Sequence, residues 1–274
     1  MMSELVVLPA YNEQENLEQA VESLIPIADW DILVVDDGSE DDTAGVARRL
    51  ARKHPRVEYV RLSFNAGIGT AVQTGFLYAV NRGYRYVGQY DGDGQHCPIS
   101  LRKLMDHAKQ NKIDLCIGSR FIHSYDHGSF AEDSFDADYI CPVGCQCDPS
   151  GNFESTWLRQ RGIFFFSHLM RLFISQRITD PTSGMRVYGP RAVSAFANCY
   201  PDDYPEPEAV FWCLRHGFSV TEMPARMKPR KNGKSSIRSF YYMVKVTAAI
   251  LFDTLRAREC VGEIPRPIKD WKMS

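Results

Sequence analysis

The sequence predicts an α/β protein built on a mostly parallel, twisted sheet with helices on both faces. Short apolar segments alternate with longer segments of helical spacing from Leu5 to Phe121, and polar residues follow each apolar segment. Strict alternation of strands and helices indicates a parallel sheet that is covered on both faces. A chain of 274 residues, of which 44% are hydrophobic and 24% charged, can bury the core that such a sheet needs.

The expected elements follow one another in a regular order. The first helix places Leu17 and Leu24 on one apolar face. Ser39 stands three residues before Asp42, a capping-box-like spacing that predicts the start of the second helix. Pro98 is well placed as the first residue of a later helix. Strands are expected over Leu5–Pro9, Ile32–Val35, Val57–Leu62, Tyr84–Gln89 and Leu115–Ile117.

Polar side chains collect where these five strands end. Parallel strands present their carboxyl ends at one edge of a sheet, and ligands bind there. Five independent strand ends with polar tips are hard to explain as solvated turns, so we expect one shared site. The residues are Tyr11, Asn12 and Glu13 after the first strand, Asp36 and Asp37 after the second, Asn65 after the third, Asp91 and Asp93 after the fourth, and Ser119 and Arg120 after the fifth.

The stretch Asp91-Gly92-Asp93-Gly94-Gln95-His96 is the centre of this expected site. Two neighbouring carboxylates repel each other unless a cation or a proton lies between them. Hard divalent cations such as Mg²⁺ and Mn²⁺ prefer oxygen ligands and leave room for phosphate oxygens. An Asp-Gly turn between two strands is the alternative interpretation. The polar ends of the neighbouring strands favour the metal site.

The segment from about residue 123 to residue 155 loses the alternation, and we interpret it as a long loop or insertion. It contains the cluster Cys141-Pro142-Val143-Gly144-Cys145-Gln146-Cys147. A structural zinc site would need a fourth ligand, for which His123 and His127 are available, but the spacing matches no common zinc pattern. A reduced loop is the favoured interpretation.

Regular structure is expected again in the rest of the chain. Trp157 to Ser175 reads as a broad apolar helix, favoured as a core or docking helix over a surface in contact with a membrane. Asp180 to Arg186 reads as a polar loop that leads into a strand. In Pro205-Glu206-Pro207-Glu208 a proline precedes each glutamate, which would stiffen a loop before the next helix.

A basic run that includes Arg230 and Lys234 surrounds a glycine and is followed by two serines. Such a run is usually a solvated face, but this composition also suits a loop that closes over phosphate. Ser239 to Arg256 reads as an amphipathic helix. It could dock on the core, pair with a second subunit or rest in a membrane interface.

Charge and hydropathy exclude several classes. A net charge of −2 gives no electrostatic case for nucleic acid as a partner. The N-terminus lacks the basic and apolar regions of a signal peptide. No apolar run reaches the roughly 18 to 20 residues of a membrane span. We therefore expect a cytoplasmic protein, with peripheral contact at the inner face of the cell membrane if its partner is a lipid.

These motifs, in this order, resemble the family 2 inverting glycosyltransferases with the Rossmann-like GT-A fold. Within that family they resemble the polyprenyl-phosphate mannosyl- and glucosyltransferases and the bacterial cell-wall polysaccharide transferases. Each motif alone is weak, whereas six in register are specific. The matching pieces are Pro9-Ala10-Tyr11-Asn12-Glu13, Val34-Val35-Asp36-Asp37-Gly38-Ser39, Asn65-Ala66-Gly67-Ile68-Gly69, Asp91-Gly92-Asp93-Gly94-Gln95-His96, Gly118-Ser119-Arg120-Phe121 and Asp180-Pro181-Thr182-Ser183-Gly184.

The resemblance implies roles for individual residues. A nucleotide-sugar donor would be held by its nucleoside, and a Mg²⁺ or Mn²⁺ ion would bridge its diphosphate and spread the negative charge of the leaving group. Basic side chains would hold phosphate of the donor or the acceptor. The residues implied for the donor are Pro9, Tyr11, Glu13, Asp36, Asp37, Asn65, Gly69 and Asp91; those for the metal are Asp91, Asp93 and Gln95; those for phosphate are Arg120, Arg230 and Lys234.

The acceptor decides whether a general base is needed. A sugar hydroxyl must lose a proton as it attacks, and Glu206 and Glu208 are the candidate bases, with Asp180 third. A polyprenyl phosphate is already anionic and needs only cations, such as Arg120 and Arg186, and an apolar groove. Either reaction is a single displacement that inverts the anomeric centre.

The resemblance thus implies a GT-A domain over residues 1–236, with the Cys-rich insertion at about 123–155, and a C-terminal amphipathic helix and tail over 237–274. The insertion and the lack of C-terminal membrane spans depart from the family pattern. The expected activity is metal-dependent transfer of a sugar to a polyprenyl phosphate or a cell-surface glycan. A nucleotidylyltransferase, which would need a glycine-rich basic loop after the first strand, and a non-catalytic nucleotide-sugar-binding protein are the alternatives.

Overall fold

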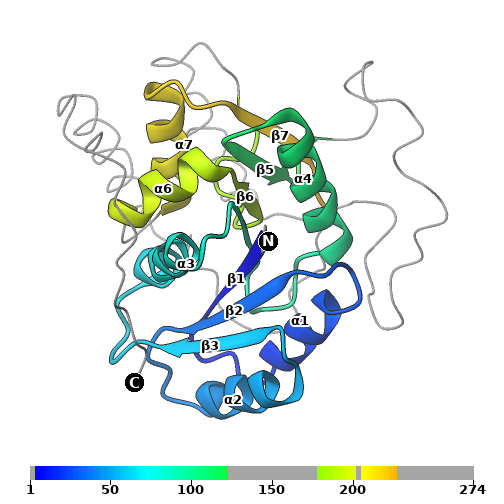
Figure 1. Ribbon diagram of the computed structural model, residues 1–274, viewed down its shortest axis with the longest axis vertical. Helices are drawn as coiled ribbons and strands as arrows, with labels where there is room; N and C mark the ends of the chain where they lie inside the picture. Colours follow the sequence, from blue (N-terminus) through cyan, green and yellow to red (C-terminus); the bar gives the residue numbers. More distant parts are fainter. Residues whose placement is uncertain (1–3, 123–177, 202–204, 227–274) are drawn as a thin grey trace.

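The structure of the protein is a computed structural model that describes residues 4–122, 178–201 and 205–226. In this part of the chain seven strands form one mixed sheet (Figure 1). The strands are β1 (Glu4–Ala10), β2 (Asp31–Asp36), β3 (Val57–Arg61), β4 (Tyr86–Gln89), β5 (Leu115–Ser119), β6 (Arg186–Tyr188) and β7 (Val220–Pro224).

The order of the strands across the sheet is β3-β2-β1-β4-β6-β5-β7. Among these seven strands, β6 runs antiparallel to its neighbours β4 and β5, and the other pairs are parallel. The carboxyl ends of the parallel strands and the amino end of β6 therefore meet at one edge of the sheet. This topology brings the loop before β6 to the edge where the sequence predicts the site.

Helices cover both faces of the sheet because successive residues of the strands point to opposite sides. In β1, Leu5 and Val7 pack in the core cluster that contains side chains of α3, α6 and α7, whereas Val6 and Leu8 pack in the cluster of α1, α2 and α4. Burial on both faces explains why this strand reads as a continuous apolar run. The helices are α1 (Leu17–Leu24), α2 (Thr43–Lys53), α3 (Ile68–Arg82), α4 (Pro98–Asn111), α6 (Pro190–Asn198) and α7 (Pro205–Arg215).

The predicted fold class and all five predicted strands are confirmed, and Pro98 is the first residue of α4 as expected. Two local predictions are wrong. α2 begins at Thr43 without a side-chain cap, because the Ser39 hydroxyl instead accepts the N–H of Asn12 at 3.0 Å. The segment Pro205-Glu206-Pro207-Glu208 lies inside the first turn of α7 rather than in a loop before it, since proline fits the first helical positions.

Other predictions concern residues outside the described part of the chain. They are the Cys-rich segment, the apolar helix at 157–175, the basic residues Arg230 and Lys234, the amphipathic helix at 239–256 and the domain boundary after residue 236. Within residues 4–122, 178–201 and 205–226, no helix has the length and apolar character needed to cross a membrane.

Candidate functional site

The loops that follow β1 and β2 are fastened to each other at the carboxyl edge of the sheet. Asn12 donates its N–H to the Ser39 hydroxyl at 3.0 Å and accepts the N–H of Glu40 at 2.9 Å. The N–H of Glu13 donates to the Thr43 hydroxyl at 2.8 Å. Asn12 adopts a left-handed conformation with φ 55°, which asparagine tolerates better than most residues. These contacts make a rigid cradle out of two separate loops.

The carboxylates of Asp36 and Asp37 are engaged inside this cradle. Asp36 is fully buried, accepts the N–H of Ser39 at 2.9 Å and lies 3.3 Å from Nε of Arg61. Asp37 accepts the N–H groups of Ala66 and Gly67 at 2.8 and 2.9 Å. Burial raises the pKa of Asp37, an effect that these two N–H groups oppose. Both carboxylates therefore hold the loops of the predicted nucleoside site in place.

The loop after β3 crosses directly over Asp37 and Gly38. Gly38 has φ +68°, and a Cβ there would lie 2.5 Å from the carbonyl carbon of Phe64, so only glycine allows this approach. The Asn65 side chain accepts the N–H of Gly67 at 3.1 Å. Gly69 is buried in the first turn of α3. The close packing ties the third strand end to the cradle.

Exposed apolar side chains gather around this cradle. In the described part of the chain, Tyr11, Phe64 and Ile68 are the exposed large hydrophobic residues, with 39%, 71% and 37% of their surface accessible. All three lie in or directly after the loops that follow β1 and β3. Pro9 is buried within β1, next to the start of the same loop.

The acidic corner follows β4, as the sequence predicts. The His96 ring lies between two parts of Asp91: its Nδ1 accepts the Asp91 N–H at 3.4 Å, and its Nε2 lies 3.5 Å from Oδ2. Asp93 accepts the N–H of Gln95 at 3.0 Å, which folds the two residues into a tight turn. A Cβ on Gly184 would lie 2.5 Å from Oδ2 of Asp91. The missing side chain at position 184 therefore leaves room for the Asp91 carboxylate.

These residues fit a Mg²⁺ or Mn²⁺ ion that is shared with a ligand. The side chains of Asp91, Asp93 and Gln95 carry oxygen atoms that can bind a metal ion, and the lack of a side chain at Gly184 lets the Asp91 carboxylate lie close to the loop before β6. Within the described residues, no three His, Cys, Asp or Glu side chains converge into a complete metal site. A divalent ion here would have to complete its coordination with phosphate oxygens or water, as Mg²⁺ commonly does.

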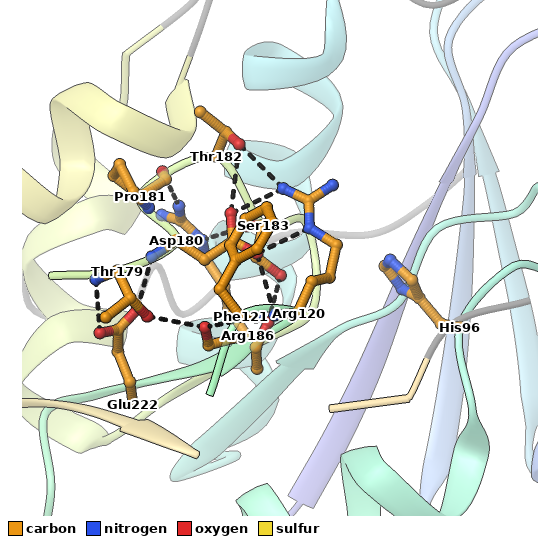
Figure 2. Close-up of polar contacts among 12 residues, drawn as sticks. His96, Arg120, Phe121, Thr179, Asp180, Pro181, Thr182, Ser183, Arg186 and Glu222 are labelled. Atoms are coloured by element: carbon orange, nitrogen blue, oxygen red, sulfur yellow. Dashed lines mark hydrogen bonds and ion pairs between the residues drawn. The ribbon is translucent and has the colours of Figure 1, made fainter. Parts of the chain in front are cut away.

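Arg120, directly after β5, forms a buried ion pair with Asp180 (Figure 2). Its Nε and Nη2 donate to Oδ2 and Oδ1 of Asp180, each at 2.6 Å, and Nη2 also donates to the Thr182 hydroxyl at 2.9 Å. Asp180 is fully buried. Both carboxylate oxygens of Asp180 accept from Arg120, and the role of Asp180 as a third candidate base stays a prediction. Asp180 and Thr182 together bind Nε and Nη2 of the Arg120 guanidinium.

Arg186, at the start of β6, is also fully buried. Its Nε donates to the Ser183 carbonyl at 2.7 Å and its Nη2 to the Pro181 carbonyl at 2.8 Å. Two of its nitrogen atoms thus support the neighbouring loop from inside the protein, and a role for Arg186 in positioning an acceptor phosphate stays a prediction.

The candidate bases Glu206 and Glu208 are half-buried in the first turn of α7. Burial raises the pKa of Glu206, and nearby positive charge on Arg186 opposes the effect. Asp91 and Arg120 also influence the pKa of Glu206, so its carboxylate lies within electrostatic range of the acidic corner.

Sequence reasoning missed three residues of this region: His96 as a support of Asp91, Gly184 as the space beside it, and Glu222 on β7. His96 and Gly184 stand within the quoted motifs, so their place in the pattern was a usable signal. Glu222 accepts the N–H groups of Thr179 and Asp180 and stands in no quoted motif.

Comparison with known proteins agrees with the resemblance drawn from the motifs. Residues 5–189 match the family described as glycosyl transferase family 2. The chain is 31% identical over 245 residues to the polyprenol monophosphomannose synthase of Mycolicibacterium smegmatis, covering 85% of this chain and 80% of that protein. It is 27% identical over 242 residues to the undecaprenyl-phosphate mannosyltransferase of Micrococcus luteus, covering 86% and 88%.

A solved structure has a similar fold. Glucosyl-3-phosphoglycerate synthase from Mycobacterium tuberculosis, crystallised with Mn²⁺, uridine diphosphate and phosphoglyceric acid, superposes with a TM-score of 0.62. The two proteins are 16% identical, and the match covers 94% of this chain and 80% of that one. The fold is the GT-A fold. With a family match across residues 5–189 and a relative 31% identical over most of both sequences, the chain belongs to glycosyl transferase family 2 and is a glycosyltransferase.

Proposed function

We propose that this enzyme transfers a sugar from a nucleotide-sugar donor to a polyprenyl phosphate, with a divalent cation and with inversion at the anomeric carbon. The observation that carries the proposal is the order of side chains along the carboxyl edge. The cradle and its exposed aromatic residues lie over β1, β2 and β3, the acidic corner follows β4, and Arg120 follows β5.

The acidic corner and Arg120 lie on the two sides of one loop. Neighbouring strands lie about 4.8 Å apart, and β6 stands between β4 and β5, so the ends of β4 and β5 are separated by about 10 Å. The loop before β6 enters between these ends, with Gly184 beside Asp91 and Asp180 beside Arg120, and the sugar would lie over this loop. The nucleoside would lie on the far side of Asp91, in the cradle.

The nucleotide-sugar donor would be bound by residues on the rigid loops of the cradle. Tyr11 and Phe64 would offer flat apolar surface to the base, and Glu13 a carboxylate to the base or ribose. Asp36 and Asp37 would act by holding the loops that carry these groups. Asp91, Asp93 and Gln95 would hold the divalent ion, which when bound stabilises the negative charge of the departing nucleoside diphosphate.

The acceptor would be bound by the guanidinium of Arg120, which Asp180 holds in place. A phosphate oxygen of the polyprenyl phosphate attacks the anomeric carbon, and the bond from that carbon to the diphosphate oxygen breaks with its electron pair on the leaving group. No proton has to move. Asp180 binds the Nε–Nη2 edge of Arg120 and fixes the guanidinium at this point of the edge, so its positive charge would attract the acceptor phosphate. Arg230 and Lys234 are proposed to add positive charge.

The names of the relatives support this acceptor, since the two mannosyltransferases compared above are named for a polyprenol or an undecaprenyl phosphate. Such an acceptor would place the enzyme at the membrane surface, on the cytoplasmic side. A cell-surface glycan, as in cell-wall polysaccharide synthesis, is the second candidate acceptor. The raised pKa of Glu206 favours it, because a hydroxyl nucleophile needs a carboxylate base near the anomeric carbon.

A binding experiment tests the donor, and a transfer experiment tests the acceptor. Thermal unfolding is measured with UDP, GDP and dTDP sugars, each with Mn²⁺ and with EDTA; a ligand that binds only the folded protein at 100 times its Kd adds about 2.7 kcal/mol of stability. We expect one nucleotide to stabilise the protein, and only with Mn²⁺. The best donor is then incubated with a polyprenyl phosphate and with the matching polyprenol. Product from the phosphate alone supports the proposal, and product from neither compound refutes the acceptor.

A further inference from the structure

The loop Thr179–Ser183 carries Asp180 to Arg120, and this loop is unusual because most of it is buried. Asp180 and Ser183 are fully buried, and Thr182 is 9% exposed. Loops normally run over the surface, because buried backbone N–H and C=O groups need partners. A buried loop at this edge must therefore be given partners by the elements around it.

Two charged side chains supply these partners from opposite ends of the loop. Glu222 on β7 accepts the N–H of Thr179 at 2.7 Å, the N–H of Asp180 at 2.8 Å and the Thr179 hydroxyl at 3.1 Å. Arg186 donates to the carbonyl groups of Pro181 and Ser183. The Glu222 carboxylate thus accepts from the N–H groups at the start of the loop, and the Arg186 guanidinium donates to the carbonyl groups at its end.

Hydrogen bonds to charged groups are stronger than those between neutral groups, and proline at position 181 removes one donor and one soft backbone dihedral. The loop is therefore fixed before any ligand arrives. In Figure 2, Glu222 lies on one side of Asp180 and Arg120 on the other. Asp180 also accepts the Arg120 N–H at 3.1 Å, so both the backbone and the side chain of Arg120 depend on where Asp180 stands.

We propose that Glu222 is a positioning residue for sugar transfer, acting through Thr179 and Asp180 to fix the guanidinium of Arg120 at the acceptor side of the site. Its carboxylate touches no group that the proposed function assigns to the substrates. The inference rests on the proposed role of Arg120, but its structural half, the link from Glu222 to Arg120, stands on the contacts alone.

The test variant is Glu222→Gln. An amide keeps the size of the side chain but places an N–H₂ group against the N–H of Thr179 or of Asp180, so one of these two contacts becomes repulsive. The matched control is Glu4→Gln. Glu4 is the first residue of β1, at the edge of the sheet opposite the site. Glu4 accepts from Nε1 of Trp30 at 2.8 Å and pairs with Lys109, so its loss perturbs a comparable polar contact far from the site.

The first readout is amide hydrogen exchange, which needs no substrate. We expect the Arg120 amide to exchange about tenfold faster or more in Glu222→Gln, since the acceptor of its hydrogen bond is displaced. Glu4→Gln should leave the Arg120 amide unchanged. Wild-type protection of Arg120 in a folded Glu222→Gln protein would overturn the proposal. If that variant does not fold, Thr179→Val removes the hydroxyl that donates to Glu222 and accepts from the Ser119 hydroxyl, and the same test applies.

The second readout is kinetic. Misplacement of a substrate-orienting group by about 1 Å can lower turnover up to about 100-fold, so kcat/KM for polyprenyl phosphate should fall about 10- to 100-fold in Glu222→Gln. The Kd of the nucleoside diphosphate with Mn²⁺ should change by less than about threefold, because the cradle after β1 and β2 lies several strands away from Glu222 on β7. The double variant Glu222→Gln/Asp180→Asn should lose no more than Asp180→Asn alone.

The two readouts separate the possible failures. Additive losses in the double variant, or an equal loss in Glu4→Gln, would overturn the positioning role of Glu222. A wild-type enzyme that binds donor but transfers nothing to polyprenyl phosphate would refute the proposed acceptor. The exchange result at Arg120 would then still decide whether Glu222 holds that side chain.

Discussion

Replacing Gly184 by alanine should weaken the binding of a divalent metal ion without unfolding the protein. The new Cβ would lie 2.5 Å from Oδ2 of Asp91, about 0.9 Å inside the 3.4 Å at which ordinary contact begins. The backbone at Gly184 is not in the left-handed region, so alanine itself is tolerated there. The atom that must give way is the end of a side chain, and Asp91 can rotate its carboxylate away.

The size of that rotation sets the expected effect. Distances from a ligand to a metal vary by about 0.2 Å, so a shift of about 0.9 Å takes Oδ2 out of the coordination sphere. Loss of well-oriented support for a metal ligand typically weakens metal binding about 10- to 100-fold, and loss of a ligand should do at least as much. The melting temperature without metal should change little, since no apolar core is disturbed.

The assay is a Mn²⁺ titration of nucleotide binding, and Gly88→Ala is the control. A Cβ on Gly88 in β4 would lie 3.3 Å from Cδ1 of Leu101 and from Cε of Met105, so it presses on the core and not on the site. We expect the Mn²⁺ midpoint to rise at least tenfold in Gly184→Ala and to stay near wild type in Gly88→Ala. A wild-type midpoint in a folded Gly184→Ala protein would refute the placement of the metal on Asp91.

Three further predictions follow from the site. Asp93→Ala should nearly abolish metal-dependent donor binding with the fold intact; calorimetry with and without EDTA checks this, and unchanged affinity would contradict it. Phe64→Ala should weaken nucleotide binding by on the order of 1–3 kcal/mol, as expected for a lost stacking contact, with unfolding unaffected because Phe64 is 71% exposed; an unaltered Kd would remove Phe64 from the site. Burial raises the pKa of Glu206 above its ordinary value of 4.5, so the folded state favours the protonated form and loses stability as the pH rises through the raised pKa. Glu206→Gln should therefore gain stability relative to wild type as the pH goes from below 4.5 to neutrality, and urea unfolding at several pH values would show no such trend if the idea is wrong.

Local patterns in the sequence were enough to predict the half of the fold that is locally encoded. Each strand from β1 to β5 is a short apolar run followed by polar residues, and each helix between them carries its own periodicity. The acidic corner could be predicted because Asp91, Asp93 and Gln95 are neighbours in the chain. No contact with a remote part of the chain is needed to place these three residues together.

The uses of Asp36, Asp37 and Ser39 could not be predicted in the same way. Their motif suggests contact with a ligand or a helix cap. In the structure Asp36 accepts the N–H of Ser39 within its own loop, whereas Ser39 and Asp37 accept N–H groups of the loops after β1 and β3. Which N–H groups lack a partner depends on how separate loops meet, and no local spacing records that. Glu222 is the extreme case, because its partners lie 42 and 43 residues away in the chain.

β6 is the element of the described sheet that is hardest to predict. It is three residues long and follows β5 only after more than sixty residues of chain, so alternation alone would place β5 beside β4. In that arrangement the ends of β4 and β5 would lie about 4.8 Å apart, with no room for a further loop between them. By entering the sheet between β4 and β5 in the opposite direction, β6 doubles that spacing. Because it is antiparallel, the loop that precedes it also arrives at the same edge, where Asp180 can hold Arg120 and Gly184 can make room for Asp91.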